Sequence, residues 1–248
     1  MRKIIFSQEE EKNRKKHISQ GGFTLIELAF VLVIIGLLIG LGASMFPMLV
    51  KQNKLRETRA LVEESKIALI GYAMAENRLP YASRNEDGLE DTGVLSGYFP
   101  YRTVGTRGKD TYLKTLYYAV DPYLCTTNNL TDFTSHLESL INGTHTPDLY
   151  YNGGIAAAFV ILSSGENLVA DPPNDDNGNG RVDTSDNNQF ASPGTPITQT
   201  YDDILEAISD SYLYGKLKQS STTTKTPVPT PQPIEKVEKS KIIMEKTL

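Results

Sequence analysis

The sequence predicts an α+β fold in which a long N-terminal helix packs on a small antiparallel sheet, with extra loops and short helices around it. Three observations predict this fold. Residues 23–46 are apolar almost throughout, residues 51–77 repeat apolar side chains at helical spacing, and two later segments, 111–120 and 155–164, have the composition of strands. Because a helix with one apolar stripe buries that stripe, the second half of the helix is expected to lie on the sheet.

The composition excludes several classes of function. The chain of 248 residues has a formal net charge of −5, and its body is acidic while its two ends are basic. It therefore lacks the overall positive charge that draws a protein to nucleic acid, and no nucleic-acid partner is expected. The single cysteine, Cys125, cannot form an intramolecular disulfide, and no group of cysteines and histidines has the spacing of a zinc site.

The apolar run at residues 23–46 predicts a transmembrane helix. As a helix it is long enough to cross about 30 Å of hydrocarbon, and Glu27 is its only ionisable side chain. Four basic residues precede the run: Lys12, Arg14, Lys15 and Lys16. By the positive-inside rule they keep the N-terminus in the cytoplasm and send the acidic body across the membrane, although Lys51 and Lys54 favour the opposite orientation weakly. A buried helix of a soluble domain is the alternative.

The residues before the apolar run distinguish it from a secretory signal peptide. Such a peptide has its small residues after the apolar region, whereas Gly21 and Gly22 come before it here. The resulting order, GGFTLIELAFVLVIIG, strongly resembles the class III leader of type IV prepilins and type II secretion pseudopilins. The resemblance implies that residues 1–22 are a cytoplasmic leader peptide. It also implies that a prepilin peptidase cuts after Gly22 and that Phe23 becomes the N-methylated first residue.

Glu27 has a physical interpretation of its own, because a carboxylate within a bilayer is costly and is usually functional. The resemblance implies that Glu27 pairs with the N-terminal amine at Phe23 of a neighbouring subunit and sets the register of that subunit in a helical filament. A glutamate that reaches to water at the membrane surface is the alternative. The chain departs from the family at one point: the proline of many major type IV pilins would align with Ser44, and here it is Pro47.

The helix is expected to continue beyond the membrane to about Asn77. Apolar side chains recur at heptad-like spacing in this part: Leu55, Val62, Leu69 and Tyr72. Pro80 then ends the helix. Residues 47–79 are therefore predicted to be the amphipathic half of one long helix, although a short coiled coil is also possible. In the resembled family this helix is the stem of a lollipop-shaped, pilin-like fold, and residues 80–219 are its globular head.

The elements of the head are predicted from local patterns. Residues 78–110 have no clear period and indicate a long surface loop. Beside the two strands named above, a hairpin to residues 166–170 and two helices are expected. One helix is capped by Thr131 and stopped by Gly143, and the other covers residues 201–218. Residues 220–248 are rich in Pro, Thr and Lys and are predicted to be a disordered tail, with a partner-binding or glycosylated tail as the alternative.

The acidic segment DDNGNGRVDTSD, residues 175–186, resembles a twelve-residue calcium loop in its spacing. It places an oxygen donor at every ligand position: Asp175, Asn177, Asn179, the Arg181 carbonyl, Asp183 and Asp186. Gly180 permits the tight turn, and Val182 is the apolar anchor toward the core. The last ligand is Asp rather than Glu and no long helix precedes the loop, so a solvated Asx and Gly turn is the alternative. Type II major pseudopilins hold Ca²⁺ in a C-terminal loop, and the resemblance therefore favours Ca²⁺ here.

No catalytic motif is found in the sequence, and the protein is not expected to be an enzyme. Ser163 and Ser164 lie before Gly165 and suggest a nucleophile only weakly, because a turn after a strand explains them equally. The adjacent acids Asp202 and Asp203 are interpreted as the first turn of a helix, whose dipole favours negative charge.

These observations favour a structural filament subunit, a minor pilin or pseudopilin. The expected precursor is a single-pass inner-membrane protein with a cytoplasmic N-terminus and a periplasmic head. Its expected partners are prepilin peptidase, other pilin or pseudopilin subunits and an inner-membrane assembly platform, and its product is a type II secretion pseudopilus or a type IV pilus. A calcium-stabilised binding or adhesion module on a pilin-like membrane anchor is the alternative. A membrane-anchored periplasmic enzyme is a third hypothesis, which no positive feature supports.

Overall fold

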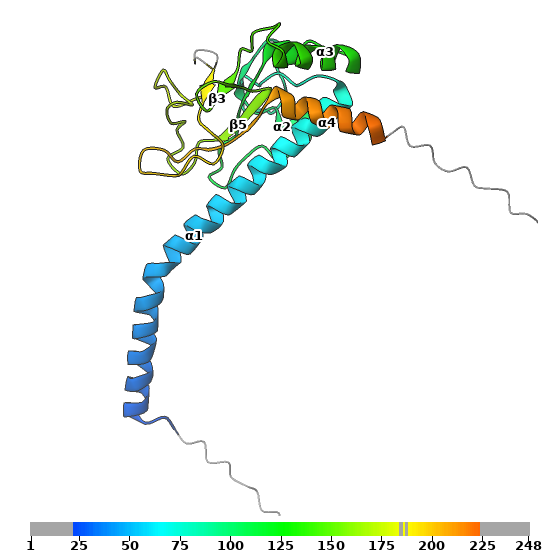
Figure 1. Ribbon diagram of the computed structural model, residues 1–248. Helices are drawn as coiled ribbons and strands as arrows, with labels where there is room; N and C mark the ends of the chain where they lie inside the picture. Colours follow the sequence, from blue (N-terminus) through cyan, green and yellow to red (C-terminus); the bar gives the residue numbers. More distant parts are fainter. Residues whose placement is uncertain (1–21, 184–185, 187, 224–248) are drawn as a thin grey trace, which may run out of the picture. The chain divides into compact units, whose positions relative to one another are not determined.

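The computed structural model of the chain describes residues 22–183, 186 and 188–223. It divides into two compact units, Met1–Lys51 and Gln52–Leu248, and each is described by itself. The predicted leader, except Gly22, and residues 224–248 of the predicted tail lie outside the described residues. Within the second unit the structure confirms the predicted α+β, pilin-like fold: a long helix packs against an antiparallel sheet with short helices (Figure 1).

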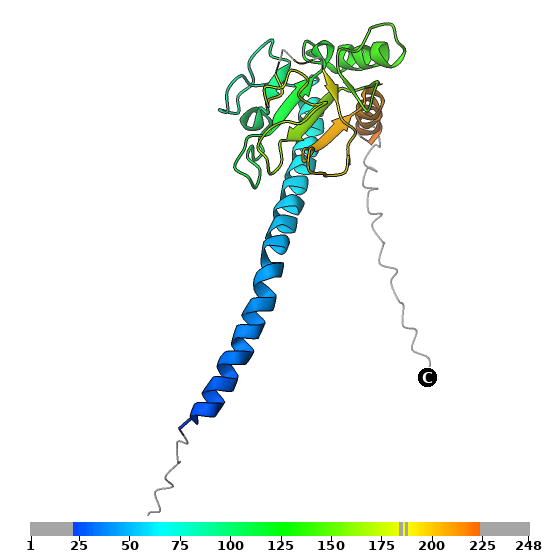
Figure 2. The ribbon, with the colours of Figure 1, turned by 90° about the vertical axis from the view of Figure 1, so that its left-hand side faces the viewer.

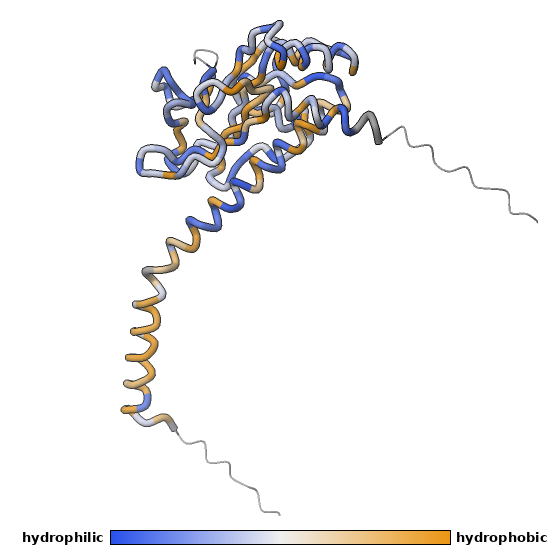
Figure 3. Tube along the Cα trace, in the orientation of Figure 1, coloured by the Kyte–Doolittle hydropathy of each residue, from blue (hydrophilic) through white to orange (hydrophobic). Residues whose placement is uncertain are grey.

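Helix α1, Leu25–Glu76, is the predicted long helix. It begins two residues after Phe23 and continues through Pro47. Asn77 follows with a left-handed φ of 55°, a conformation that asparagine tolerates, so α1 ends where the sequence predicts. Figure 3 shows the change of hydropathy along it, from an almost unbroken apolar segment to an alternation of apolar and polar residues.

In the first unit, the apolar side chains of α1 are exposed along its whole circumference. The 18-residue window with the highest mean hydropathy reaches 2.7, and none of it is buried within the chain. By length and composition, α1 is the one helix in the described part of the chain that can cross a membrane. The segment therefore requires an apolar environment that the described part of the chain does not supply.

In the second unit, the remainder of α1 is one-sided, as predicted. Leu61, Val62, Leu69 and Ala73 are buried against the sheet. A polar contact fixes the helix to the sheet edge, where the Lys66 ammonium donates to the Glu206 carboxylate at 3.0 Å. The spacing of apolar residues over 51–77 therefore corresponds to a packed face.

The main sheet has four strands in the order β1-β2-β5-β7, and every neighbouring pair is antiparallel. The strands are β1 (Ser96–Tyr98), β2 (Tyr117–Val120), β5 (Phe159–Ser163) and β7 (Ile204–Ile208). All residues of β2 and β5 are buried. Both faces of the sheet are therefore covered. Because side chains on both faces of β2 and β5 are buried, the sequences of these strands are almost continuously apolar.

The two faces of the sheet contribute to two separate cores. Alternate residues such as Tyr118 and Phe159 belong to the core that contains α1, and their neighbours Tyr117 and Val160 belong to the other. On the first face lie α3 (Leu130–Ile141) and α4 (Asp210–Thr223), which pack on each other and share that core with α1 (Figures 1 and 2). The helices α1, α3 and α4 therefore lie on one side of the sheet.

A second, smaller sheet and the acidic segment cover the other face. This sheet has the order β4-β3-β6, in which β3 pairs antiparallel with β4 and parallel with β6. Its strands are β3 (Tyr150–Tyr151), β4 (Ile155–Ala156) and β6 (Gln189–Phe190). Val182 and Phe190 pack there against Leu205 of the main sheet. The acidic segment therefore lies on the sheet face that is remote from α1.

Several predictions of elements in the head are wrong, and nonlocal pairing explains each. Residues 204–208 form β7 rather than the first half of a helix, because they pair along their whole length with β5. Residues 166–170 form turns and no strand, since β5 already has β2 and β7 as neighbours. The segment 78–110 is not only a loop. It contains β1 and a one-turn helix, α2 (Tyr101–Val104).

The helix boundaries in the head also differ slightly from those predicted. The N-cap of α3 is Asn129 rather than Thr131, and its side-chain oxygen accepts the Asp132 N–H at 2.9 Å. Gly143, with a φ of 71°, follows the last turn as expected. A short 3₁₀ helix, η1 (Pro122–Leu124), connects β2 to α3. The helix α4 extends to Thr223, into the first residues of the segment predicted as a tail.

Candidate functional site

The predicted calcium loop, residues 175–186, is folded around Asp175, which is 2 % exposed. Its Oδ1 accepts the N–H groups of Gly178 at 2.8 Å and Asn179 at 3.3 Å, and its Oδ2 accepts the N–H of Gly180. Gly178 and Gly180 both have a φ near +77°, a conformation in which a side chain would be strained. The glycines thus allow the backbone to wrap around one carboxylate.

The other side chains of the predicted ligand set meet within the same loop. The Asn177 amide donates to Asp186 Oδ1 and the Asn179 amide to Asp183 Oδ2, each at 2.9 Å. Asn179 Oδ1 accepts the Arg181 N–H at 2.9 Å. Burial, together with the charges of Asp183 and Asp175, raises the pKa of Asp186. The loop therefore gathers oxygen donors, while in this structure hydrogen bonds from neighbouring N–H groups occupy several of them.

Val182 points into the core as the sequence predicts. It is 1 % exposed and packs in the second core. The Ala170 N–H donates to the Gly180 carbonyl at 3.1 Å, which fixes the turn to the segment before the loop. The loop is thus attached at its centre as well as at its ends.

A second acidic group, which the sequence did not indicate, lies next to this loop. One carboxylate oxygen from each of Asp171, Asp202 and Asp203 lies within 4.8 Å of the other two. Asp171 and Asp203 are buried, and Asp202 is partly buried. Three close carboxylates repel one another unless a cation or a proton neutralises them. This cluster of three aspartates can hold a metal ion.

Backbone and amide groups fix the orientation of the three carboxylates. Asp203 Oδ2 accepts the Asp171 N–H and the Asn174 amide, both at 2.8 Å, and Asp171 Oδ2 accepts the Asp202 N–H at 2.8 Å. Within the described residues, Asp202 Oδ1 and Asp203 Oδ1 are buried and have no hydrogen-bond partner. Burial, followed by the charges of Asp171 and Asp202, raises the pKa of Asp203 to about 7.

The pairing of β5 with β7 creates this cluster. Ser163 at the end of β5 lies opposite Ile204 at the start of β7, so the segments that adjoin these two ends meet. Gly165, with a φ of 61°, packs so closely that an added Cβ would lie 2.3 Å from the Asp202 carbonyl oxygen. The sequence interpretation of Asp202 and Asp203 as a helix N-terminus is therefore wrong, because a strand follows them.

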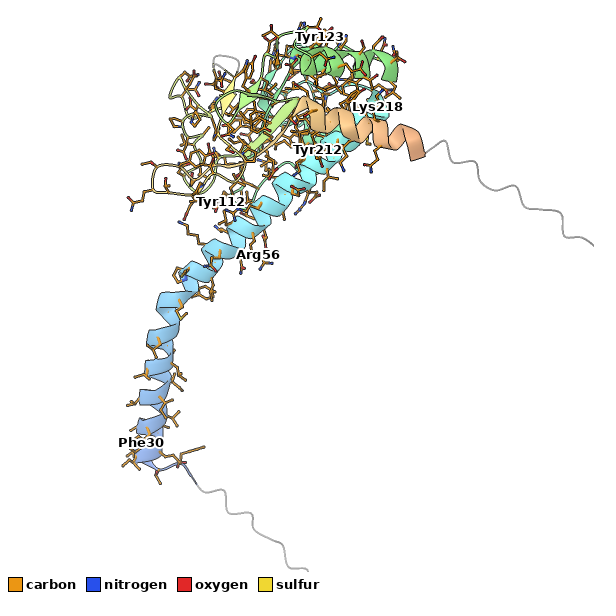
Figure 4. The ribbon with its side chains drawn as sticks, in the orientation of Figure 1. Phe30, Arg56, Tyr112, Tyr123, Tyr212 and Lys218 are labelled. Carbon is orange, nitrogen blue, oxygen red and sulfur yellow. The ribbon has the colours of Figure 1, made fainter. Side chains whose placement is uncertain are left out.

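The two serines that suggested a nucleophile have structural contacts, and so do the cysteine and the two histidines of the head. The Ser163 hydroxyl donates to Asp110 Oδ2 at 2.6 Å in a buried position, and Ser164 is buried beside it. Cys125 is 3 % exposed, and burial raises the pKa of its thiol. His136 and His145 stack on Tyr123, with ring centroids 3.7 and 3.9 Å away; Figure 4 shows Tyr123 beside α3.

At the start of α1, the structure places the residues of the predicted processing site outside the helix. Gly22 and Phe23 are exposed, and a Cβ added to Gly22 would meet no described residue within 4 Å. The Thr24 hydroxyl accepts the Glu27 N–H at 3.3 Å and so caps the first turn. Glu27 itself is an exposed residue of that turn. The peptide bond after Gly22 is therefore free of helical hydrogen bonds and accessible.

Comparison with known families decides the nature of this terminus. Residues 18–43 match the family described as the prokaryotic N-terminal methylation motif. The chain carries the N-terminal methylation motif of type IV pilins and type II pseudopilins. No curated protein sequence and no solved structure matches the chain significantly.

The methylation motif confirms the resemblance drawn from GGFTLIEL and implies processing by prepilin peptidase. The apolar helix that begins within it is consistent with a membrane-anchored pilin. The motif also suggests a structural, non-enzymatic protein. It covers residues 18–43 only, so it carries no information about the ligands of the head.

Proposed function

We propose that this protein is a minor pilin or pseudopilin, a structural subunit of a type II secretion pseudopilus or a type IV pilus. In this proposal, prepilin peptidase cuts after Gly22, Phe23 is N-methylated and an assembly platform in the inner membrane lifts the subunit into the filament. The observation that carries the proposal is the methylation motif at the start of a helix whose apolar side chains are exposed all around. Such a surface is stable in lipid before assembly and against the helices of other subunits afterwards.

The proposed topology is a single-pass inner-membrane protein with its N-terminus in the cytoplasm and its head in the periplasm. The basic residues before the apolar run support it. Glu27 is proposed to pair with the methylated amine of a neighbouring subunit. Its position in the first turn of α1 supports this role, because a carboxylate there lies one turn from the residue that becomes the new terminus.

The processing step is tested by the mass of the intact protein, expressed with and without a prepilin peptidase. We expect the peptidase to remove residues 1–22 and to leave a chain that begins at Phe23 and carries one added methyl group. Gly22→Glu is expected to prevent cleavage, because a large charged residue replaces the small residue before the cut. Gly21→Ala serves as the matched control and should be processed normally. A wild-type chain that keeps its leader beside an active peptidase would overturn the proposal.

We further propose that the head is stabilised by Ca²⁺ held in the loop 175–186. The gathered oxygen donors of that loop and the adjacent cluster of three aspartates support the presence of a cation in this region. Its likeness to extracellular sites predicts a dissociation constant of about 10⁻⁴ M. At a hundredfold excess of Ca²⁺ over that constant, the free energy of unfolding should rise by about 2.7 kcal/mol.

Thermal unfolding of the full chain in detergent, with 10 mM Ca²⁺ or with a chelator, measures this effect and locates it. Asp186→Asn is expected to remove the Ca²⁺-dependent rise in Tm, while Asp148→Asn, at an exposed position outside the region, retains it. A rise that survives Asp186→Asn but disappears in Asp202→Asn would assign the ion to the cluster of three aspartates instead. An equal Tm for the wild type in Ca²⁺ and in chelator would exclude the calcium proposal.

A further inference from the structure

A groove opens on the sheet face that is remote from α1. Its cavity has a volume of about 500 Å³, which lies in the range of small-molecule sites. The floor contains Tyr98 of β1 and Tyr117 of β2, whose rings stack with centroids 5.3 Å apart and planes inclined by 20°. Arg84, Arg181 and Asp183 also line the cavity.

A second hollow extends this groove. Its volume is about 310 Å³, and it shares Tyr98, Tyr117 and Arg181 with the first. Lys114 adds another cationic group to its wall. The two hollows together form one elongated site, which we call the tyrosine groove. Its lining comes from three parts of the chain: residues within 84–98, Lys114 with Tyr117, and residues within 168–183.

The tyrosine groove contains more cationic than anionic side chains, because Arg84, Arg181 and Lys114 line it together with Asp183 and Glu86. Arg84 and Arg181 are exposed, and neither guanidinium makes a hydrogen bond or an ion pair with any residue that the structure describes. In contrast, Arg78 and Arg107 each pair with a glutamate, at 2.6 and 2.7 Å. In a chain with a net charge of −5, two unpaired arginines that line one cavity indicate an anionic ligand.

The groove restricts the class of that ligand. A guanidinium fork fits a carboxylate with two parallel hydrogen bonds. Tyr98 is partly exposed and stacks on the buried Tyr117, so its ring offers an aromatic surface on which the apolar face of a sugar ring can lie. Asp183, whose Oδ2 accepts the Asn179 amide, adds a negative charge to the groove and disfavours a ligand that is purely anionic. A sugar that bears one carboxylate among several hydroxyls satisfies all three features.

An acidic peptide fits less well. A peptide usually binds a sheet by adding a strand to its edge, and β1 is an edge strand. However, Tyr98 of β1 already exchanges backbone hydrogen bonds with Ser83, at 2.8 and 2.9 Å. The edge beside the groove is therefore occupied by the chain itself. We propose that the tyrosine groove binds an acidic saccharide, with Arg84 and Arg181 on its carboxylate and Tyr98 against its ring.

This inference goes beyond a role in the filament, because the groove lies on the opposite face of the sheet from α1.

The test is calorimetric titration of the full chain, in a detergent without a sugar headgroup, with three probes of similar length. These are trigalacturonate, neutral maltotriose and triglutamate. We expect saturable binding of trigalacturonate, and at least about tenfold weaker binding of the other two, because each lacks either the carboxylate or the sugar ring.

Variants locate the binding. Arg84→Gln and Arg181→Gln should each weaken trigalacturonate binding at least about tenfold, whereas Arg56→Gln, on the exposed side of α1 (Figure 4), should bind like the wild type. All three residues are exposed, so loss of binding would not result from unfolding. Three results would overturn the proposal: no saturable binding of trigalacturonate, equal binding of triglutamate, or an equal loss in Arg56→Gln. None of them would affect cleavage after Gly22, which the mass measurement tests separately.

Discussion

Glu27→Gln is expected to be cleaved and methylated normally and to be almost absent from filaments. Gln has the size of Glu but no charge, so the helix stays in the membrane at a lower desolvation cost. What it loses is the attraction to the methylated amine of the adjacent subunit. In a low-dielectric environment such a charge pair is strong, and an unpaired amine in the filament core is costly. The amount of protein in filaments should fall at least about tenfold.

Filaments sheared from cells and quantified against the membrane fraction provide this measurement, and intact mass confirms that the variant is processed. Glu57→Gln removes a carboxylate from an exposed position of α1 outside the first unit and is the matched control. Glu27→Asp, which keeps the charge on a shorter side chain, should restore part of the assembly. Normal filament levels of Glu27→Gln would show that the carboxylate does not act in assembly.

Asp210→Asn is expected to stabilise the head at neutral and alkaline pH. Asp210 is the first residue of α4 and is 3 % exposed, and neither carboxylate oxygen has a hydrogen-bond partner among the described residues. Burial, followed by the charge of Asp121, raises its pKa to about 7. Asn has nearly the same shape and carries no charge at any pH. It therefore removes the cost of a buried, unpaired carboxylate.

The sign of the pH effect follows from the raised pKa. Below about pH 4 the carboxyl of Asp210 is protonated in both the folded and the unfolded state and costs nothing. As the pH rises from about 4 to 7, the unfolded state loses its proton first, so the free energy of unfolding falls. A shift of about three pKa units corresponds to about 4 kcal/mol. The helix dipole recovers about 1 kcal/mol of this by favouring a negative charge at the start of α4.

Urea unfolding of the full chain in detergent at pH 4 and pH 8 tests this prediction. The variant should exceed the wild type by about 2–3 kcal/mol at pH 8 and by little at pH 4. Asp132→Asn, in the exposed first turn of α3, should change the free energy of unfolding by less than about 0.5 kcal/mol at either pH. A gain in Asp210→Asn that is equal at both pH values would mean that the raised pKa is not its cause.

The long helix could be predicted from the sequence because its signals are local. Three signals each act within a few turns of the chain: the single ionisable side chain in residues 23–46, the spacing of apolar residues over 51–77, and Pro80. The strand β7 could not be predicted in the same way. Leu205, Glu206 and Ala207 favour a helix by local propensity, and only pairing with β5 makes them a strand.

The candidate sites also differ in whether their signals are local in the sequence. The methylation motif and the loop 175–186 are contiguous in sequence, so residue type and spacing indicate them directly. The cluster of three aspartates depends on Asp171 meeting Asp202 and Asp203 across the chain reversal between β5 and β7. The tyrosine groove brings Arg84 beside Arg181 from distant parts of the sequence. Contacts of this kind depend on strand order, which no local pattern specifies.

The pairing of Ser163 with Ile204 has a consequence for how such a protein can diversify. The intervening residues 164–203 leave the main sheet and return to it at hydrogen-bonded neighbours. They include the loop 175–186, the cluster of three aspartates and part of the lining of the tyrosine groove. A connecting segment whose two ends lie on neighbouring strands can be shortened, lengthened or exchanged without altering the strand order. Related subunits can thus share the same assembly helix and differ in the binding surface that this connecting segment forms on the head.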